Sequence, residues 1–387
     1  MTVNAERLRR WRLALGEPAD TSMVLGEADR RLDAALSAVY DVDEGPKGRG
    51  GLRGSAPRVS RWLGDIREFF PSSVVQVIQR DAFERLGLKR MLLEPEFLGA
   101  LEADVHLVAD LVALRAVMPD KTKATARLVI EKVVRELMAR LEAKTVESVR
   151  GALDRSTRTT RPRPRDIDWP RTIRRNLQTY QPALGTLIAE TLVGFQRNSR
   201  RAKLEQVVLC IDQSGSMATS VVYASVFGAV LASIPALATR LVAFDTAVLD
   251  LTAELADPVD VLFGVQLGGG TDIARALGYC ETLVTEPTRT HLILVSDLFE
   301  GGDDGPMLAR AAALVERGVN IIALLALSDA GKPASCEPTA RRLAALGVPV
   351  FACTPDLFPE LMAAALRRQD IGAWAAARDI TLARAQD

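Results

Sequence analysis

The second half of the chain alternates strand-like and helix-like patterns, and this alternation constrains the fold more than any other feature of the sequence. After residue 203, the apolar runs VVLCI, LILVS and IIALLAL are separated by stretches in which apolar residues recur at helical spacing. The runs are apolar at every position, which is typical of strands covered by helices on both faces. The pattern predicts an α/β, doubly wound, Rossmann-like domain with a mostly parallel sheet, its strands at 206–211, 240–244, 291–296, 319–327 and 348–352, and its helices at 217–234, 273–283, 306–317, 338–346 and 356–367.

The first half, to about residue 200, carries helical patterns instead. Its clearest example, 121–150, follows the start signal Pro119-Asp120 and places apolar residues such as Ala126, Ile130 and Leu137 on one helix face. We therefore expect a mostly α-helical N-terminal domain. Shorter helical patterns cover 22–39, 61–70, 72–86 and 95–117, while 41–60 is rich in Gly, Pro, Lys and Arg and is predicted as a mobile loop or linker.

Between the halves, residues 155–175 are dense in arginine and contain Pro162, Pro164 and Pro170. Proline at this density prevents a continuous helix, so we expect an extended connector. Its positive charge favours a solvated linker or a strap that pairs with an acidic surface; nucleic-acid binding is the alternative, although no aromatic interleaving or known nucleic-acid motif accompanies the charge. The predicted domains are a helical N-terminal domain at 1–154, a basic connector and helical segment at 155–202, the α/β domain at 203–373 and a C-terminal tail at 374–387.

Composition narrows the class of protein. Lys+Arg and Asp+Glu are equal at 49 each, so no global electric field attracts nucleic acid or an anionic membrane. The four cysteines form no CxxC pair, which is the usage of a reducing compartment and excludes a cysteine zinc site. The start MTVNAERLRRWRLALG lacks the apolar core of a signal peptide, and we expect no stretch of the roughly 18 uncharged apolar residues that a membrane-spanning helix needs. These features predict a cytoplasmic protein with no membrane segment.

Oxygen-bearing side chains gather where the first strand of the α/β domain ends. Asp212, Ser214 and Ser216 alternate along the segment DQSGS, and Gly215 allows the loop to fold them around one point. Carboxylate and hydroxyl oxygens are hard ligands, so the segment suits Mg²⁺ or Mn²⁺ rather than zinc. The alternative is helix capping, in which Ser214 or Ser216 accepts hydrogen bonds from free backbone amides.

Two later loops bring further oxygen ligands to the same edge of a doubly wound sheet. Thr271 lies in GGGTD before a helix, and Asp297 ends the strand-like run LILVSD. With DQSGS, these segments resemble, in order, the three parts of the metal-ion-dependent adhesion site of a von Willebrand factor A (vWA) domain. The resemblance implies that Ser214, Ser216 and Thr271 touch the metal and that Asp212 and Asp297 hold its water ligands. Because the direct ligands are mostly neutral, a carboxylate from a partner would be bound strongly at the open position.

Three neighbouring acidic residues have simpler explanations. Asp272 is expected to be the N-cap or first-turn residue of its helix. Asp245 and Glu300 are expected to be solvated loop charges at the rim. None of the three is predicted as a metal ligand.

The resemblance covers nearly the whole chain and narrows to the bacterial CoxE-like vWA proteins. It rests on the helical N-terminal half and on the segments DIDWPRTIRRNLQTYQPALGTLIAE, DQSGSM and CTPDLFPELMAAAL. Members of that family are typically encoded beside MoxR-type AAA+ ATPases and are thought to act with them in maturing or remodelling other proteins. This chain has no Walker A sequence, so an ATPase would have to be a separate partner. The implied function is a metal-dependent protein-protein interaction adaptor, and the ATPase or a client protein supplies the acidic residue.

Enzyme functions fit the same residues less well. A serine hydrolase needs GxSxG and a nearby base, whereas Ser214 lies between Asp212 and Ser216. The two histidines, His106 and His291, fall in a predicted helix and at the start of a predicted strand. A phosphotransferase that uses Asp212 normally carries a second carboxylate two residues later, where this chain has Ser214. We expect no catalytic residues; a metal-dependent phosphohydrolase and a nucleic-acid-associated protein that uses the basic connector are the alternatives.

Overall fold

The chain forms two compact units, Met1–Val133 and Val134–Asp387. The boundary falls inside the long helix α7 (Asp120–Ser156), which ends close to the predicted boundary at 154/155. The computed structural model describes residues 25–40, 56–86, 88–93, 98, 101–156, 158–162, 164, 167–182, 185–195, 204–265, 269–327 and 335–383.

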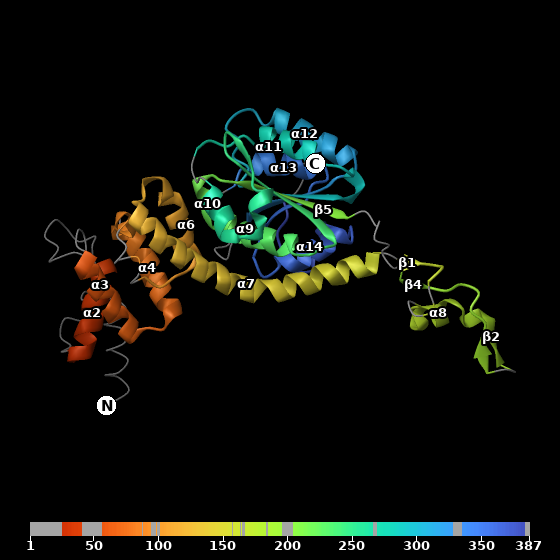
Figure 1. Cartoon of the computed structure of the whole chain (residues 1–387), viewed down its shortest axis with the longest axis horizontal. Helices are drawn as coiled ribbons and strands as arrows, with labels where there is room; N and C mark the ends of the chain where they lie inside the picture. The colour runs from red at the N-terminus through yellow and green to blue at the C-terminus, as the bar shows by residue number, and fades with distance from the viewer. Residues whose placement is uncertain are drawn as a thin grey trace. The chain divides into compact units, whose positions relative to one another are not determined.

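A sheet with helices around it forms the centre of the second unit (Figure 1), and its six strands have the order β10-β9-β8-β5-β6-β7. All neighbouring strands are parallel except β6 and β7, which are antiparallel. The strands that follow β5 in the sequence lie first on one side of it, as β6 and β7, and then on the other side, as β8, β9 and β10. This order confirms the predicted doubly wound fold. The strands are β5 (Glu205–Asp212), β6 (Leu237–Phe244), β7 (Val248–Asp250), β8 (Thr290–Val295), β9 (Asn320–Leu327) and β10 (Val350–Cys353).

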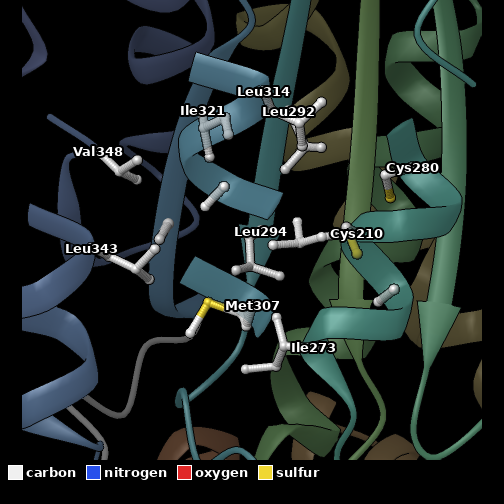
Figure 2. Packing of buried hydrophobic residues seen from close by; sticks show 14 of the residues in the cluster. Cys210, Ile273, Cys280, Leu292, Leu294, Met307, Leu314, Ile321, Leu343 and Val348 are labelled. Carbon is white, nitrogen blue, oxygen red and sulfur yellow. The ribbon is translucent and has the colours of Figure 1, made fainter. Parts of the chain in front are cut away.

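Helices cover both faces of this sheet (Figure 1). On one face, Leu292 and Leu294 of β8 pack with apolar side chains such as Ile273, Met307 and Leu343 from three helices (Figure 2). On the other face, the rings of Phe227 and Phe358 lie 4.3 Å apart. The first face is covered by α11 (Ile273–Leu283), α12 (Gly305–Glu316) and α13 (Glu337–Ala345), and the second by α9 (Ala218–Ala232), α10 (Pro258–Gly264) and α14 (Phe358–Leu366).

Helix α9 corrects one expectation from the sequence. Within the described part of the chain, the stretch Gly215–Ala232 is long and apolar enough to cross a membrane by length and composition alone. The prediction that no such stretch exists was therefore wrong. The stretch is 72% buried inside the protein, and a core helix meets the same criteria, so its apolar character is explained by packing against the sheet.

The first unit is helical, as predicted. Trp62 donates its indole N–H to the Ala35 carbonyl over 2.8 Å, and the Tyr40 hydroxyl donates to Asp81 over 2.6 Å. Of the predicted helix 95–117, residues 95–97 and 99–100 lie outside the described residues, 101–104 are not helical, and α6 begins at Val105, where the Asp104 carboxylate caps it by accepting from Leu107 N (2.7 Å). The helices are α2 (Glu27–Tyr40), α3 (Ala56–Phe69), α4 (Ser72–Leu86), α6 (Val105–Leu114) and the first part of α7, with a 3₁₀ turn η2 (Leu88–Leu93); residues 41–55 of the predicted loop lie outside the described residues.

The basic segment after α7 folds into a small motif of its own. β1 (Arg158–Thr159) pairs antiparallel with β4 (Gly194–Phe195), and α8 (Trp169–Arg175) lies between them in the sequence. The expectation of an extended chain up to residue 175 was wrong for α8, because Pro170 occupies its first turn, where a proline is tolerated. The motif also contains η5 (Leu177–Thr179), β2 (Tyr180–Gln181) and β3 (Thr186–Leu187).

Near the C-terminal end of the described chain, helix α15 (Ile371–Ala376) spans the predicted domain boundary at 373/374.

Candidate metal centre

The centre lies where the neighbouring strands β5 and β8 end, at the point where the strand order of the sheet reverses. Ile211 and Val295 are partners in the parallel pairing, so the next residues, Asp212 and Ser296, meet at the edge. The Ser296 hydroxyl donates to Asp212 Oδ2 (2.7 Å), and Ser214 N donates to Asp212 Oδ1 (2.8 Å). Asp212 is fully buried. Burial raises the pKa of the Asp212 carboxyl, and the hydrogen bonds that it accepts from Ser214 and Ser296 lower the pKa by less.

A chain of hydrogen bonds joins the remaining predicted side chains of the two loops. The Ser216 hydroxyl donates to Asp297 Oδ2 over 2.5 Å, and the hydroxyl oxygens of Ser214 and Ser216 lie 3.2 Å apart. Ser214 stands at the N-cap of the turn Gly215–Met217 but makes no side-chain capping bond there. Helix capping therefore does not explain the two serines.

Thr271 reaches the same edge through its backbone. Its carbonyl accepts from Gly301 N (2.8 Å), which lies four residues after Asp297. A Cβ built on Gly301 would stand 2.8 Å from that carbonyl oxygen, so only glycine allows the two loops to approach this closely. The structure thus links Asp212, Ser214, Ser216 and Asp297 by hydrogen bonds at the cluster, and it brings Thr271 to the adjoining loop.

The neighbouring acidic residues stabilise the loops. Asp272 caps α11 by accepting from Arg275 N (2.8 Å), as predicted. The expectation of a solvated charge at Glu300 was wrong, because its carboxylate accepts from Ile273 N (2.9 Å) at the start of α11, and its burial raises the pKa of the carboxyl. Asp245 was also expected to be a solvated charge; it is half-buried and accepts from Ala247 N (2.6 Å) in the turn after β6.

Two further residues of the site, Ser296 and Phe299, were not predicted from the sequence. Ser296 is 1% exposed, and its hydroxyl both donates to Asp212 and accepts from Leu298 N (3.0 Å). Leu298 has a φ of 63°, which is rare for a branched side chain, and it is buried. This backbone conformation leaves Phe299 50% exposed, two residues after Asp297. A polar residue beside Asp297 at the end of a buried strand was the available signal for Ser296.

The donor set suits a hard cation. Hydroxyl and carboxylate oxygens from two loops meet at one edge, the third loop adjoins them through the Thr271 backbone, and hydroxyl and carboxylate oxygens are the ligands that Mg²⁺ and Mn²⁺ prefer. Among the described residues, no group of three or more His, Cys, Asp or Glu side chains could hold a metal ion, so hydroxyl oxygens would have to take part. Because the Ser216 hydroxyl directs its hydrogen toward Asp297, its lone pairs are available to a cation.

The histidines lie elsewhere in the described structure. His106 Nε2 contacts Arg80 (3.0 Å) in the first unit. His291 is the second residue of β8, at the opposite end of that strand from Asp297, and its Nδ1 contacts the Asn320 side chain (3.0 Å). Neither is placed as the general base of Ser214.

Comparison with known proteins decides the family. The family model described as "VWA domain containing CoxE-like protein" matches residues 137–362. The chain belongs to the CoxE-like VWA family. This CoxE-like VWA protein is also 36% identical over 358 residues to "Uncharacterized protein YehP" of Escherichia coli (strain K12), an alignment that covers 91% of this chain and 95% of YehP.

Solved structures are similar to parts of this CoxE-like VWA protein. An aerotolerance-related membrane protein from Bacteroides fragilis NCTC 9343, with multiple mutations to serines, matches 42% of this chain and 99% of its own, at 12% identity and a TM-score of 0.34. A von Willebrand factor type A protein from Catenulispora acidiphila matches 43% of each chain, at 17% identity and a TM-score of 0.34. The RO (RSR) protein of Deinococcus radiodurans matches 95% of this chain and 74% of its own, at 14% identity and a TM-score of 0.33.

Proposed function

We propose that this CoxE-like VWA protein is a metal-dependent adaptor that binds a partner protein through an acidic side chain of the partner. The observation that carries the proposal is the contact chain Ser214–Ser216–Asp297, with the buried Asp212 behind it, at the edge where β5 and β8 end. Ser214 is half-buried and Ser216 is exposed, so the cluster is open to a partner on its hydroxyl side.

Ser214, Ser216 and Thr271 would hold Mg²⁺ or Mn²⁺ directly, and Asp212 and Asp297 would hold its water ligands. When bound, the cation supplies an electrophilic position that a carboxylate can fill. The three direct ligands are neutral, so a partner carboxylate would be the only anion in direct contact with the cation. Asp212 and Asp297 are buried, so their carboxylates would be held in place behind the hydroxyls of Ser214 and Ser216.

Phe299 would extend the partner-binding surface beside the metal. Its amide donates to Asp297 Oδ1 (3.3 Å), while the buried Leu298 anchors the loop from below. An aromatic side chain that is half exposed can bury apolar surface of a partner next to the acidic residue. The preferred partner segment would therefore combine an Asp or Glu with a neighbouring apolar residue.

A separate ATPase would supply energy to this adaptor. This part of the proposal rests on the family to which the chain belongs, together with the absence of a Walker A sequence. The adaptor is proposed as a non-enzyme because, among the described residues, neither histidine is placed to act as a base at the cluster. Turnover of p-nitrophenyl phosphate in Mg²⁺, abolished by Asp212→Ala, would favour the phosphohydrolase instead.

The test is partner recovery from an extract of the source cells, on immobilised full-length protein, with Mg²⁺ or with EDTA. Recovery should require Mg²⁺ and should fall in Ser214→Ala and Thr271→Ala, because each removes a ligand without opening an apolar cavity. The loss is expected on the order of 2–5 kcal/mol, or roughly 30-fold to several thousandfold in affinity. Ser233→Ala is the matched control, since Ser233 is exposed at the far end of α9. If EDTA and Ser214→Ala both left recovery unchanged, the interaction would not run through the metal site.

A further inference from the structure

Exposed apolar side chains concentrate on the small motif that follows α7. Five of the twelve exposed large hydrophobic residues of the described chain lie within 169–188, although this stretch is short. Monomeric proteins seldom gather exposed apolar side chains in this way unless the surface binds something. The five are Trp169 (54% exposed), Ile173 (45%), Leu177 (61%), Tyr180 (52%) and Ile188 (54%).

Helix α8 is held to the motif by polar contacts instead of apolar ones. Thr172 is fully buried, and its hydroxyl donates to the Val193 carbonyl (3.0 Å) and accepts from Val193 N (3.0 Å). Asn176 is 4% exposed, and its side chain bonds both the carbonyl (2.8 Å) and the amide (3.0 Å) of Thr191. Polar residues therefore fix the helix while its apolar residues face outward, which is the reverse of the usual arrangement.

The outward apolar residues form a narrow stripe. Trp169 and Ile173 lie four residues apart on α8, so at about 100° per residue they fall within about 40° of each other, and Leu177 follows in η5, two residues after the helix ends. Ile188 lies opposite Thr179, the last residue of η5, whose hydroxyl donates to the Ile188 carbonyl over 2.5 Å. A single narrow seam of this kind matches the contact that one helix makes with another.

The motif also carries an excess of positive charge, although the chain as a whole is neutral. Residues 158–195 contain seven arginines against three acidic residues, whereas the whole chain has 49 of each sign. Arg171 lies 3.7 Å from Asp168. Arg174 and Arg175 are exposed, and within the described part of the chain they form no ion pair with an acidic side chain. Positive charge beside the stripe complements an acidic partner.

We infer that this stripe, defined by Trp169, Ile173, Leu177, Tyr180 and Ile188, docks an amphipathic helix of a partner protein whose flanking residues are acidic. Nucleic acid fits less well, because bases stack on aromatic rings and two of the three residues on the seam, Ile173 and Leu177, are aliphatic. A membrane surface fits less well, because interfacial helices bury a wide apolar face and α8 has only seven residues. The surface goes beyond the proposed metal-dependent function and needs no cation.

The test is selection from a displayed library of amphipathic helical peptides on full-length protein in EDTA, which removes any contribution of the metal site. Enriched peptides should carry an apolar seam at i, i+4 and i+7 flanked by Asp or Glu. Affinity of the best synthetic peptide should fall at least about tenfold in Ile173→Ser/Leu177→Ser and in Arg174→Glu/Arg175→Glu. Leu249→Ser, on the exposed β7, is the matched control and should bind as the wild type does.

Several results would overturn the inference. These are an absence of enriched peptides, enrichment without acidic residues, or equal binding by Ile173→Ser/Leu177→Ser. Poly(U) RNA or phosphatidylserine vesicles that bind in an Ile173-dependent manner would assign the surface to another class of partner. Hydroxyl-radical footprinting of the free monomer measures the solvent exposure of the stripe. Low reactivity of its residues would show that another part of the chain covers them. Circular dichroism and unchanged Mn²⁺ titration of each variant separate these outcomes from misfolding and from failure of the metal proposal.

Discussion

At the scale of single residues, Gly301 connects the two loops that the proposed metal site requires. Its amide donates to the Thr271 carbonyl, and a Cβ on Gly301 would lie 2.8 Å from that oxygen. Because close packing leaves no room for such an approach, Gly301→Ala must push Thr271 away from the loop after β8. We predict that this variant binds Mn²⁺ about tenfold or more weakly in a calorimetric titration.

Gly302 supplies the matched control for that experiment. A Cβ built there meets nothing within 4 Å, so Gly302→Ala should bind Mn²⁺ with the affinity of the wild type. Equal affinities for the two alanine variants would show that the position of Thr271 has no influence on the cation.

Ser296 is predicted to stabilise the protein without any metal. Its hydroxyl satisfies both the buried Asp212 carboxylate and Leu298 N, so Ser296→Ala removes a donor and an acceptor at once. Unsatisfied buried polar groups of this kind cost about 1–3 kcal/mol, and urea unfolding in EDTA should show a loss of that size. Ser233→Ala should change the free energy of unfolding by less than about 0.5 kcal/mol. A Ser296→Ala variant as stable as the wild type would contradict the role of this bridge.

Local spacing was enough to predict most of the cluster. Asp212, Ser214 and Ser216 follow one strand, and Asp297 follows another, so the parallel sheet brings them together as expected. The contact between Ser296 and Asp212 depends on the pairing of β5 with β8, which no local pattern encodes. Glu300 was misjudged for a similar reason, because its partners belong to α11, 26 and 27 residues earlier.

At the scale of elements, Glu360 joins α14 to its neighbours. Arg378 donates to its carboxylate (2.8 Å) and Lys144 of α7 lies 3.6 Å away, and the pKa of Glu360 is lowered chiefly by the Arg378 bond. A lowered folded-state pKa stabilises the protein above the unfolded pKa of about 4.3, and the effect is lost as pH falls through the folded value. Glu360→Gln should lower Tm by about 1–3 °C at pH 7 and leave it unchanged below pH 3, by calorimetry.

Glu316→Gln is the control for this pair. Glu316 ends α12, is exposed, and forms no ion pair within the described part of the chain. Its substitution should leave Tm unchanged at both pH values. A Tm difference for Glu360→Gln that persisted below pH 3 would contradict an ionic contribution.

Long apolar elements were predictable from the sequence, and short or partly exposed ones were not. The five predicted strands are present and nearly all of their residues are buried, whereas β7 has three residues, none of them buried, at the sheet edge. α8 was missed because its arginines and Pro170 resemble a connector, and because its buried residues, Thr172 and Asn176, are polar. Burial by hydrogen bonding leaves no hydrophobic period to detect.

At the scale of the whole molecule, the second compact unit extends beyond residues 203–373. Lys144 of α7 donates to the Asp356 carbonyl (2.7 Å), and Ala383 N donates to Val350 of β10 (2.9 Å). Trp374 is 8% exposed and its ring lies 6.1 Å from that of Phe351. We predict that the fragments 134–387 and 202–373 both fold, and that the shorter one has a Tm lower by about 5–10 °C in calorimetry.

Two outcomes would contradict this prediction. Equal Tm values would mean that α7 and the C-terminal residues contribute nothing to the α/β core. Failure of both fragments to fold, by circular dichroism, would mean that residues 1–133 complete that core.

The central claim is that the oxygen cluster at the ends of β5 and β8 binds a divalent cation, and calorimetric titration of the full-length protein with Mn²⁺ tests it most directly. The wild type should bind one Mn²⁺, and Asp212→Ala should show no detectable binding while it keeps the circular dichroism spectrum of the wild type. Asp272→Asn removes a neighbouring charge but keeps the α11 cap, so it should bind within about twofold of the wild type. Unchanged Mn²⁺ affinity in Asp212→Ala, or no binding by the wild type, would contradict the claim.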